Sequence, residues 1–335
     1  MDKTNLLNKL KPEIVKLDQT MRDDLKDLAA RDLVPANLLE PLEHALFNGG
    51  KRIRPLLCIL AARLCSSAPG NNIYPLAIAF EYLHVATLLH DDVIDHAETR
   101  RGRPTVNETF GLTQAILTGD FLHARSLFLV GTIGGSRCLD RICRATEAMV
   151  SGEFLQLANA RNLNQSENDY FAVIRGKTAL FIGAVCEIGG IFAGADKTDT
   201  EQLRQYGANL GLAFQIQDDL LDYLGDAAKT GKTVGNDFFE GKMTLPLIHT
   251  LKTAGDKEKN FLLGLLAGDQ KERREKFSEA QKIIRESGGF EYSVKLAEKL
   301  VDTAIKSLAS FSSERNKDIV DILTGLARYV ISRDK

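Results

Sequence analysis

The spacing of apolar positions predicts helices along most of the chain. Between residues 3 and 30, apolar side chains such as Leu10, Leu17 and Met21 recur every three or four positions among charged ones, which is typical of an amphipathic helix. Convincing alternating strands are absent from the pattern, so we expect an all-α fold. The same period predicts further helices over residues 52–66, 73–96, 112–133, 138–161, 168–193 and 199–225, with shorter ones over 244–332.

The segment 73–96 is apolar on nearly every side, as expected of the central helix of a bundle. Polar loops are expected at 100–107 and 226–242, but no Pro-, Ser- or Gly-rich linker divides the chain. The length of 335 residues would by itself allow two domains. We expect a single domain over residues 1–335, built as a large helical bundle around a central cavity.

Composition narrows the classes of partner. The formal net charge is −2, so the chain lacks the overall basic field of a nucleic-acid-binding protein. Its five cysteines, an odd number without a Cys-x-x-Cys pair, favour reduced thiols in a cytosolic protein. The first residues lack a signal-peptide profile, and no apolar run is expected to approach the roughly 20 residues that span a bilayer. We expect a soluble, cytoplasmic protein without a transmembrane segment.

An acidic triplet ends the central helix. Asp91, Asp92 and Asp95 follow an apolar run, and Arg100 and Arg101 lie just beyond them. Residues four apart share one face of a helix, so Asp91 and Asp95 are expected to point together while Asp92 lies to the side. Two carboxylates in that arrangement suit Mg²⁺, which takes oxygen ligands and completes its shell with water and substrate phosphate.

A second acidic triplet repeats the first. Asp218, Asp219 and Asp222 have the same spacing 127 positions later (218 − 91), again after apolar residues and before basic ones. One such triplet alone could equally be a solvated helix end. Two copies in similar surroundings indicate a shared chemical role.

A basic cluster lies at residues 49–55, Gly-Gly-Lys-Arg-Ile-Arg-Pro. Its glycines leave backbone exposed before a helix start, where N–H groups and the helix dipole favour an anion. Lys51 and Arg54, three apart, are expected to share one face. Taken alone, the cluster could be a basic helix start with solvated side chains, and His84, two turns before Asp91, could be an ordinary core histidine.

Two better-known site patterns are excluded. Glu81 and His84 match half of a di-iron motif, but the chain has no second Glu-x-x-His. The Gly-Lys-Thr triplets at 176–178 and 231–233 lack the glycine five positions earlier that a phosphate-binding P-loop requires. The combination that survives, carboxylates with Mg²⁺ and nearby Arg and Lys groups, suits a diphosphate that is held and then drawn off as a leaving group.

Together these segments resemble the trans-isoprenyl diphosphate synthases, the polyprenyl synthetases. The similarity covers roughly residues 40–250 and keeps the order of the family's motifs. The segments that carry it are Gly49-Gly-Lys-Arg-Ile-Arg-Pro55, Asp91–Asp95 with Arg100 and Arg101, Lys177-Thr178-Ala179, Gln215–Asp222, Gly231-Lys232 and Gly241-Lys242-x-Thr-Leu-Pro246.

The resemblance implies head-to-tail condensation of isopentenyl diphosphate with an allylic diphosphate primer, in a helical bundle with a central elongation cavity. Three Mg²⁺ ions per active site would act on the leaving diphosphate as Lewis acids. The isopentenyl double bond would attack the allylic cation, and the released proton would pass to the departing diphosphate. The family also implies a homodimer.

The resemblance assigns a role to each matching position. Isopentenyl diphosphate would be bound by Lys51, Arg54, His84 and Arg101. The allylic diphosphate and its developing cation would be met by Arg100, Lys177, Thr178, Gln215, Lys232 and Lys242. Asp91, Asp95 and Asp218 would be direct Mg²⁺ ligands, supported through water or hydrogen bonds by Asp92, Asp219 and Asp222.

Product length is governed in this family by residues just upstream of Asp91. Short-chain members typically place an aromatic residue four or five positions before that aspartate, where this chain has Thr87 and Ala86, with Leu83 one turn deeper. The first aromatic residue on roughly the same side is Phe80, about 16 Å along the helix at ~1.5 Å per residue. A deep cavity favours a long product, with octaprenyl diphosphate as the best single assignment and geranylgeranyl diphosphate as the main alternative.

Other functions fit the motifs less well. A class I terpene cyclase would pair the first triplet with a different second motif, and a non-catalytic subunit would be expected to lose aspartates. A plain helical scaffold gives no reason for acidic and basic motifs to coincide. A farnesyl-length product and a catalytic subunit of a heteromeric synthase stay open.

Overall fold

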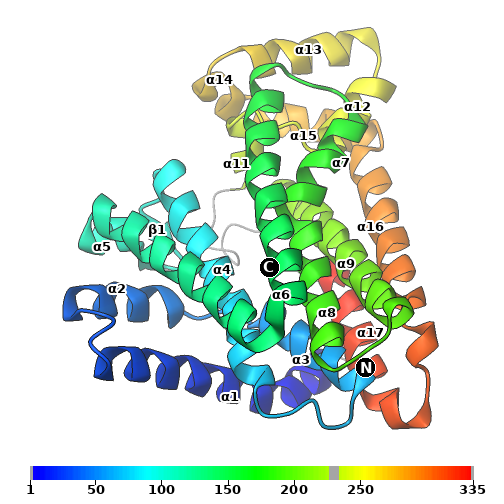
Figure 1. The fold of residues 1–335 in the computed structure, drawn as a ribbon. Coiled ribbons are helices and arrows are strands. Elements are labelled where there is room, and N and C mark those ends of the chain that lie inside the picture. Colours follow the sequence, from blue (N-terminus) through cyan, green and yellow to red (C-terminus); the bar gives the residue numbers. More distant parts are fainter. Residues whose placement is uncertain (1–2, 226–233, 333–335) are drawn as a thin grey trace. The chain divides into compact units, whose positions relative to one another are not determined.

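The computed structural model describes residues 3–225 and 234–332 and confirms the all-α prediction (Figure 1). Its α-helices are α1 (Lys3–Ala30), α2 (Ala36–Leu46), α3 (Ile53–Cys65), α4 (Ile73–Ile94), α5 (Val106–Phe110), α6 (Leu112–Arg161), α7 (Glu167–Ile174), α8 (Leu180–Phe192), α9 (Lys197–Leu224), α11 (Asn236–Phe239), α12 (Leu245–Thr253), α13 (Asp256–Ala267), α14 (Gln270–Glu275), α15 (Phe277–Glu286), α16 (Gly289–Lys306) and α17 (Lys317–Ser332). A π-helix, η1 (Arg175–Ala179), joins α7 to α8, and the 3₁₀ turns η2 (Ala309–Phe311) and η3 (Glu314–Asn316) precede α17.

The predicted helices begin and end within two residues of observed ones, apart from two breaks. The break expected between residues 133 and 138 is a single glycine inside α6, Gly135, with φ 76° and ψ −177°. The helix expected over 168–193 contains η1. The apolar pattern does not predict α2. The loop expected at 100–107 holds a short antiparallel pair, β1 (Thr99–Arg100) and β2 (Arg103–Pro104), whose strands are too short to show alternation.

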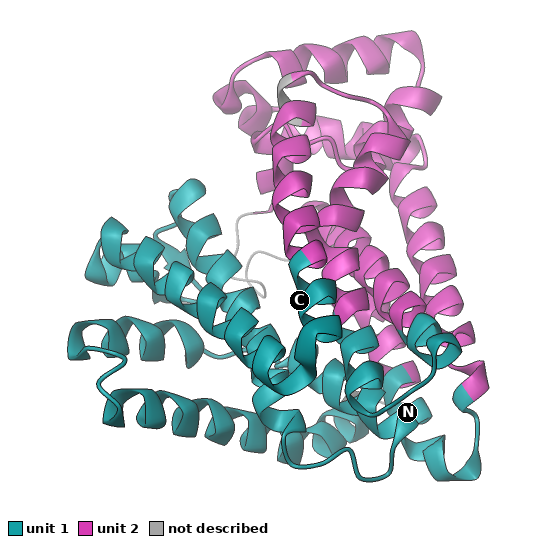
Figure 2. Ribbon diagram, viewed as in Figure 1, with its two compact units in different colours: residues 1–143, 185–203, 311–323 teal, residues 144–184, 204–310, 324–335 magenta. Residues whose placement is uncertain are grey.

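The chain forms two compact units, shown in teal and magenta in Figure 2. Unit 1 comprises residues 1–143, 185–203 and 311–323, and unit 2 comprises residues 144–184, 204–310 and 324–335. The boundaries between them fall inside α6, α8, α9, η2 and α17. Neither unit is therefore one continuous stretch of sequence, and the number of domains stays a prediction.

In unit 1, α4 contacts α1, α2, α3 and α5. This explains why α4 is apolar on nearly every side: residues from Ile73 to Leu89, including Phe80 and Tyr82, are buried along its length. The expectation that no apolar run approaches the length of a membrane span is wrong when helices are judged by length and composition alone. Among the residues that the structure describes, two helices pass that test, Ile73–Ile94 and a window within Leu112–Asn159, and the first is 72% buried, as a core helix would be.

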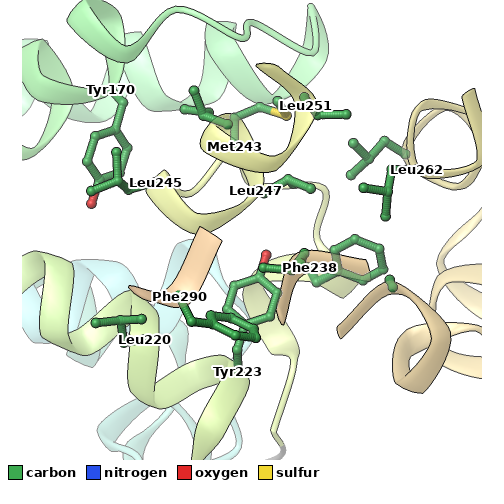
Figure 3. Close-up of a cluster of buried hydrophobic side chains, with 14 of the residues drawn as sticks. Tyr170, Leu220, Tyr223, Phe238, Met243, Leu245, Leu247, Leu251, Leu262 and Phe290 are labelled. Carbon is green, nitrogen blue, oxygen red and sulfur yellow. The ribbon is translucent and has the colours of Figure 1, made fainter. Parts of the chain in front are cut away.

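The core of unit 2 gathers aromatic and aliphatic side chains from α7, α9, α11, α12, α13, α15 and α16 (Figure 3). Tyr223 of α9 is fully buried, lies edge-on to Phe238 and donates or accepts a 3.0 Å hydrogen bond with Thr244. Leu220 and Ile216 extend the same buried face of α9. These contacts fix the rotation of α9, and that rotation decides which way its acidic triplet points.

Candidate active site

The first aspartate triplet lies at the end of α4 in unit 1. The backbone N–H of Asp95 donates to the carbonyl of Asp91 at 2.8 Å, so these two aspartates lie one helical turn apart, as the spacing predicts. Asp91 is half-buried and Asp95 is exposed, whereas Asp92 is 4% exposed. The triplet therefore has two aspartates nearer to solvent and one turned inward.

Arg100 pairs with the inward aspartate. Its Nε and Nη2 atoms lie 2.8 Å and 2.7 Å from Oδ1 of Asp92. The β1–β2 hairpin holds this arginine in place, because its two turn residues, Arg101 and Gly102, have φ of 54° and 76°, the positive values that match the twist of the paired strands. Nη1 of Arg101 then donates to the carbonyl of Gly49.

The predicted basic residues come together around His84. Burial lowers the pKa of Arg54 to about 10, where Glu81 opposes the shift and Arg101 adds to it. Burial, followed by the charges of Arg54, Arg101 and Arg100, holds the pKa of His84 well below its usual range. His84 is therefore neutral at pH 7 and keeps one N–H to donate.

One expectation about this cluster is wrong. Lys51 precedes the helix, because α3 begins at Ile53 and its N-cap residue, Arg52, has a left-handed φ of 51°. Lys51 and Arg54 therefore do not share a helix face. Lys51 is exposed and Arg54 is half-buried.

Sequence reasoning missed Arg52 and its partners. Arg52 is 4% exposed and donates to Asp18 at 2.9 Å, to Glu81 at 2.8 Å and to the carbonyl of Leu46 at 2.7 Å. An arginine between Lys51 and Arg54, and a glutamate within an apolar helix, were the available signals. The partner of Glu81 is thus a guanidinium, which accounts for this carboxylate without a metal.

The second triplet, in unit 2, repeats the division of the first. Asp218 is exposed, Asp222 is half-buried and Asp219 is 6% exposed. Asp219 accepts from the hydroxyl of Tyr170 at 2.7 Å and from Nε2 of Gln215 at 3.2 Å. The hydroxyl of Thr178 donates to Oε1 of the same Gln215 at 3.1 Å, so two predicted residues belong to one network with Asp219.

Asp222 is bound to the start of α11. It accepts from the backbone N–H groups of Asn236 at 3.2 Å and of Asp237 at 3.0 Å. Lys242 closes the group, with its Nζ 3.0 Å from Asp237 and 2.7 Å from Glu240. Burial and Asp237 raise the pKa of Asp222 to about 7. Burial and Asp237 likewise raise the pKa of Asp219 to about 8.

Lys177 and Thr178 lie on the π-helix η1, a helix type that often marks functional positions. Nζ of Lys177 is 2.6 Å from Oε2 of Glu153 on α6. The two elements approach closely: a carbon added at Gly176 would lie 2.7 Å from the carbonyl oxygen of Ala148. Tyr170, Glu153 and Asp237 are therefore partners that sequence reasoning missed, because only the fold brings them to the motif residues.

The predicted chain-length residues lie on α4. A carbon added at Gly119 of α6 would clash with the ring of His90, and one added at Gly134 would lie 3.6 Å from Leu76. Between those two points of α4, Leu83 is 1% exposed and Ala86 is 2% exposed. The hydroxyl of Thr87 donates to the carbonyl of His84 at 2.8 Å.

Each unit thus holds its own part of the predicted set. In unit 1, Arg54, Arg100 and Arg101 lie near His84, and Arg100 is bonded to Asp92. In unit 2, Thr178, Gln215 and Lys242 are bonded directly or through one residue to the second triplet. Lys232 and the Gly-Lys-Thr triplet at 231–233 lie outside the described residues.

Comparison with known proteins agrees with the motifs. The polyprenyl synthetase family model matches residues 35–284. Octaprenyl diphosphate synthase of Escherichia coli (strain K12) is 33% identical over 326 residues, which cover 93% of this chain and 99% of that protein. Geranylgeranyl diphosphate synthase of Saccharolobus solfataricus is 34% identical over 316 residues, which cover 91% of this chain and 94% of that protein.

Solved structures agree as well. The crystal structure of a polyprenyl synthase from Caulobacter crescentus CB15, complexed with calcium and isoprenyl diphosphate, matches with a TM-score of 0.87 and 35% identity, over 99% of this chain and 98% of that one. The family match spans most of the chain, and the two relatives exceed 30% identity over about nine tenths of it. This chain belongs to the polyprenyl synthetase family.

Proposed function

We propose that this protein is a prenyltransferase that condenses isopentenyl diphosphate with an allylic diphosphate, head to tail and repeatedly, to give an all-trans polyprenyl diphosphate and diphosphate. One observation carries the proposal. In each triplet one aspartate, Asp92 or Asp219, is buried and bonded within the protein, while Asp91, Asp95 and Asp218 lie nearer to solvent. Acidic side chains near solvent, with basic groups close by, suit a divalent cation bound together with an anionic substrate.

The proposed cofactor is Mg²⁺, three ions per active site, with Asp91, Asp95 and Asp218 as direct ligands. The donor set fits, because Mg²⁺ is usually held by one or two carboxylates, with water and substrate phosphate at its other positions. Within residues 3–225 and 234–332, no three His, Cys, Asp or Glu side chains gather as a complete metal site. When bound, the ions would act as Lewis acids on the departing diphosphate.

Isopentenyl diphosphate is proposed to bind at the basic cluster of unit 1, through Lys51, Arg54, His84 and Arg101. Guanidinium groups bind phosphate oxygens bidentately, and neutral His84 adds a donor without adding charge. Burial is the main cause of the lowered pKa of Arg54, and repulsion from Arg101 adds to it. An incoming diphosphate would relieve that repulsion.

The allylic diphosphate is proposed to bind through Arg100, Lys177, Thr178, Gln215, Lys232 and Lys242. Lys177 and Lys242 now pair with carboxylates, and each keeps 30% of its side chain exposed. Those ion pairs would exchange for contacts to phosphate oxygens as the substrate enters. The proton released on condensation would pass to the departing diphosphate.

For the product we propose a long chain, octaprenyl diphosphate, because Ala86 and Thr87 stand where a short-chain enzyme would carry a ring. The relatives leave the length open, since an octaprenyl and a geranylgeranyl synthase are similar to this chain to nearly the same extent. Geranylgeranyl and farnesyl diphosphate stay as alternatives, as does a catalytic subunit of a heteromeric synthase.

We also propose a homodimer in the cytoplasm. Its support is the part of α6 that belongs to unit 1, where large apolar side chains are exposed, among them Leu117 and Phe128, each at 57%. Exposed apolar side chains gathered on one element mark interaction surfaces. Light scattering of the purified chain tests this proposal, and a monomer at micromolar concentration would refute it.

The activity is tested by incubating the purified chain with Mg²⁺, farnesyl diphosphate and labelled isopentenyl diphosphate, then sizing the dephosphorylated products by chromatography. We expect octaprenol, and no product in EDTA. If no allylic primer supports incorporation of label, the proposed activity is wrong. A product of geranylgeranyl length would leave the activity intact and refute the long-chain assignment.

A further inference from the structure

A buried arginine lies directly between two residues proposed to bind isopentenyl diphosphate. Arg52 follows Lys51 and precedes Arg54 by two positions, yet its side chain is only 3% exposed. Its Nε, Nη1 and Nη2 donate to Asp18, to Glu81 and to the carbonyl of Leu46, at 2.9, 2.8 and 2.7 Å. Every nitrogen of this guanidinium therefore already has a partner inside unit 1.

The backbone at Arg52 is held in an uncommon conformation. Its φ is 51°, in the left-handed region that side-chain-bearing residues seldom adopt and keep only where the surroundings impose it. The residue is also the N-cap of α3. The direction in which the chain leaves Lys51 and enters the first turn of α3, which carries Arg54, therefore depends on the bonds that hold the Arg52 side chain.

Arg52 also forms one wall of the turn that precedes it. A carbon added at Gly50 would lie 3.3 Å from Nη1 of Arg52 and 3.1 Å from Nη1 of Arg101, so Gly50 lies between the two guanidinium groups. Arg101 in turn donates to the carbonyl of Gly49. The location of the Arg101 guanidinium is thus tied to the same turn that Arg52 anchors.

The charges of this group make an anchor necessary. Burial is the largest cause of the lowered pKa of Arg54 and of Arg101. Repulsion adds to it, from Arg101 on Arg54 and from Arg100 and Arg52 on Arg101. The charge of Glu81 raises the pKa of all three arginines. A buried carboxylate bonded to Arg52 thereby offsets part of this repulsion, and a cluster that is ordered before its ligand arrives binds that ligand more strongly.

We propose that Arg52, held by Glu81 and Asp18, is a positioning residue for isopentenyl diphosphate, a role that rests on the function proposed above. Arg52 does not touch the substrate. It acts through the backbone of Lys51 and Arg54 and, across Gly50, through Arg101. Its loss should therefore weaken this one substrate and leave the allylic substrate nearly unaffected.

The main test variant is Arg52→Lys, which keeps the charge but cannot make three diverging hydrogen bonds. We expect its KM for isopentenyl diphosphate to rise about tenfold, the size of one lost charge-assisted hydrogen bond. Its kcat and its KM for farnesyl diphosphate should change by less than about threefold. Its Kd for inorganic diphosphate without metal, from isothermal titration, should rise in parallel with the KM for isopentenyl diphosphate.

The chain offers a matched control on the same helix. Arg63 of α3 also bonds an acidic residue of α1, donating to Glu13 at 2.9 Å, and it donates to Tyr74 at 3.0 Å. Arg63→Lys should lower thermal stability. It should leave the KM for isopentenyl diphosphate, the KM for farnesyl diphosphate and the Kd for diphosphate at their wild-type values. If Arg52→Lys also lowers stability but keeps the wild-type KM for isopentenyl diphosphate and the wild-type Kd for diphosphate, Arg52 is only a stabilising residue and the proposal is overturned.

A second pair of variants covers the case in which Arg52→Lys fails to fold. The side chain of Asp18 is 38% exposed on α1, where alanine favours the helix, and Asp18→Ala removes one of the three bonds. We expect the Kd of Asp18→Ala for diphosphate to rise about threefold, less than the rise expected for Arg52→Lys. The control, Glu13→Ala, should keep the wild-type Kd. Equal Kd values in both variants would refute the proposal. If the wild type binds diphosphate more tightly than Arg52→Lys but makes no product, the proposed function fails and the role of Arg52 in anion binding stands.

Discussion

The contact between α6 and η1 in unit 2 gives the sharpest test of how Lys177 is held in place. A carbon added at Gly152 of α6 would lie 2.8 Å from the backbone nitrogen of Lys177, 3.1 Å from the carbonyl oxygen of Val173 and 3.2 Å from the carbonyl carbon of Gly176. All three are backbone atoms, which cannot rotate away as a flexible side chain can. Gly152→Ala must therefore move one of the two elements.

The size of that movement follows from the distances. Ordinary contact begins at 3.4 Å, so the nitrogen of Lys177 must retreat by 0.6 Å (3.4 − 2.8). Overpacking of this kind typically costs about 1–3 kcal/mol of stability, which a domain of this size tolerates. Misplacing a catalytic group by about 1 Å can reduce the rate about 100-fold. The expected shift of Lys177 is somewhat smaller, so we expect kcat/KM to fall by roughly 10- to 100-fold.

The assay compares Gly152→Ala with Gly264→Ala in α13, where an added carbon meets nothing within 4 Å. The control should gain about 0.5–1 kcal/mol, because alanine favours a helix over glycine, and its kcat/KM should not change. Thermal unfolding and product formation from labelled isopentenyl diphosphate measure both effects. If Gly152→Ala is as stable and as active as the wild type, η1 is free to move and the argument that its backbone positions Lys177 is wrong.

Three further predictions follow from the triplets and from α4. Asp218→Ala should lower kcat by a factor on the order of 100 or more without loss of fold, because the leaving group loses Lewis-acid help; full activity of the variant, or of the wild type in EDTA, would contradict it. Ala86→Phe should shorten the product to about geranylgeranyl length and leave the first condensation nearly unaffected, and a wild-type product length would show that the growing chain does not pass Ala86. Asp219→Asn should stabilise the metal-free protein at pH 8.5 more than at pH 5, because an acid whose pKa is raised to about 8 by folding destabilises the native state progressively as the pH rises from about 4 to about 8; equal shifts in Tm at both pH values would refute it.

The helical period of the apolar residues predicted most of the fold and part of the candidate site. It predicted α4 and α9 almost to their ends, because both bury apolar faces against several helices. It also placed Asp91 and Asp95 one turn apart, since a local spacing is a property of the helix itself. Features that depend only on residues close together in the sequence could be predicted in this way.

Features that depend on residues far apart in the sequence could not be predicted. Arg52 bonds Asp18 from 34 positions away, and Tyr170 bonds Asp219 from 49 positions away. No local pattern pairs such residues, and each bond requires several helices to pack first. The expectation for Lys51 and Arg54 failed because it assumed a regular helix, whereas α3 begins only at Ile53 and Arg52 before it has a left-handed backbone.

The two aspartate triplets also show that equal spacing does not give equal electrostatics. The buried aspartate of the first triplet, Asp92, is paired with the guanidinium of Arg100 at 2.7 Å, so its negative charge is balanced by a cation. The buried aspartate of the second, Asp219, accepts hydrogen bonds from the neutral donors Tyr170 and Gln215, and burial, followed by the charge of Asp237, raises its pKa to about 8. Below that pH it carries a proton in the metal-free protein. A divalent cation bound at the second triplet, as proposed, would displace a proton, whereas the buried charge of the first triplet is already balanced by Arg100. The pH dependence proposed for Asp219→Asn follows from this difference, which the identical Asp-Asp-x-x-Asp spacing conceals.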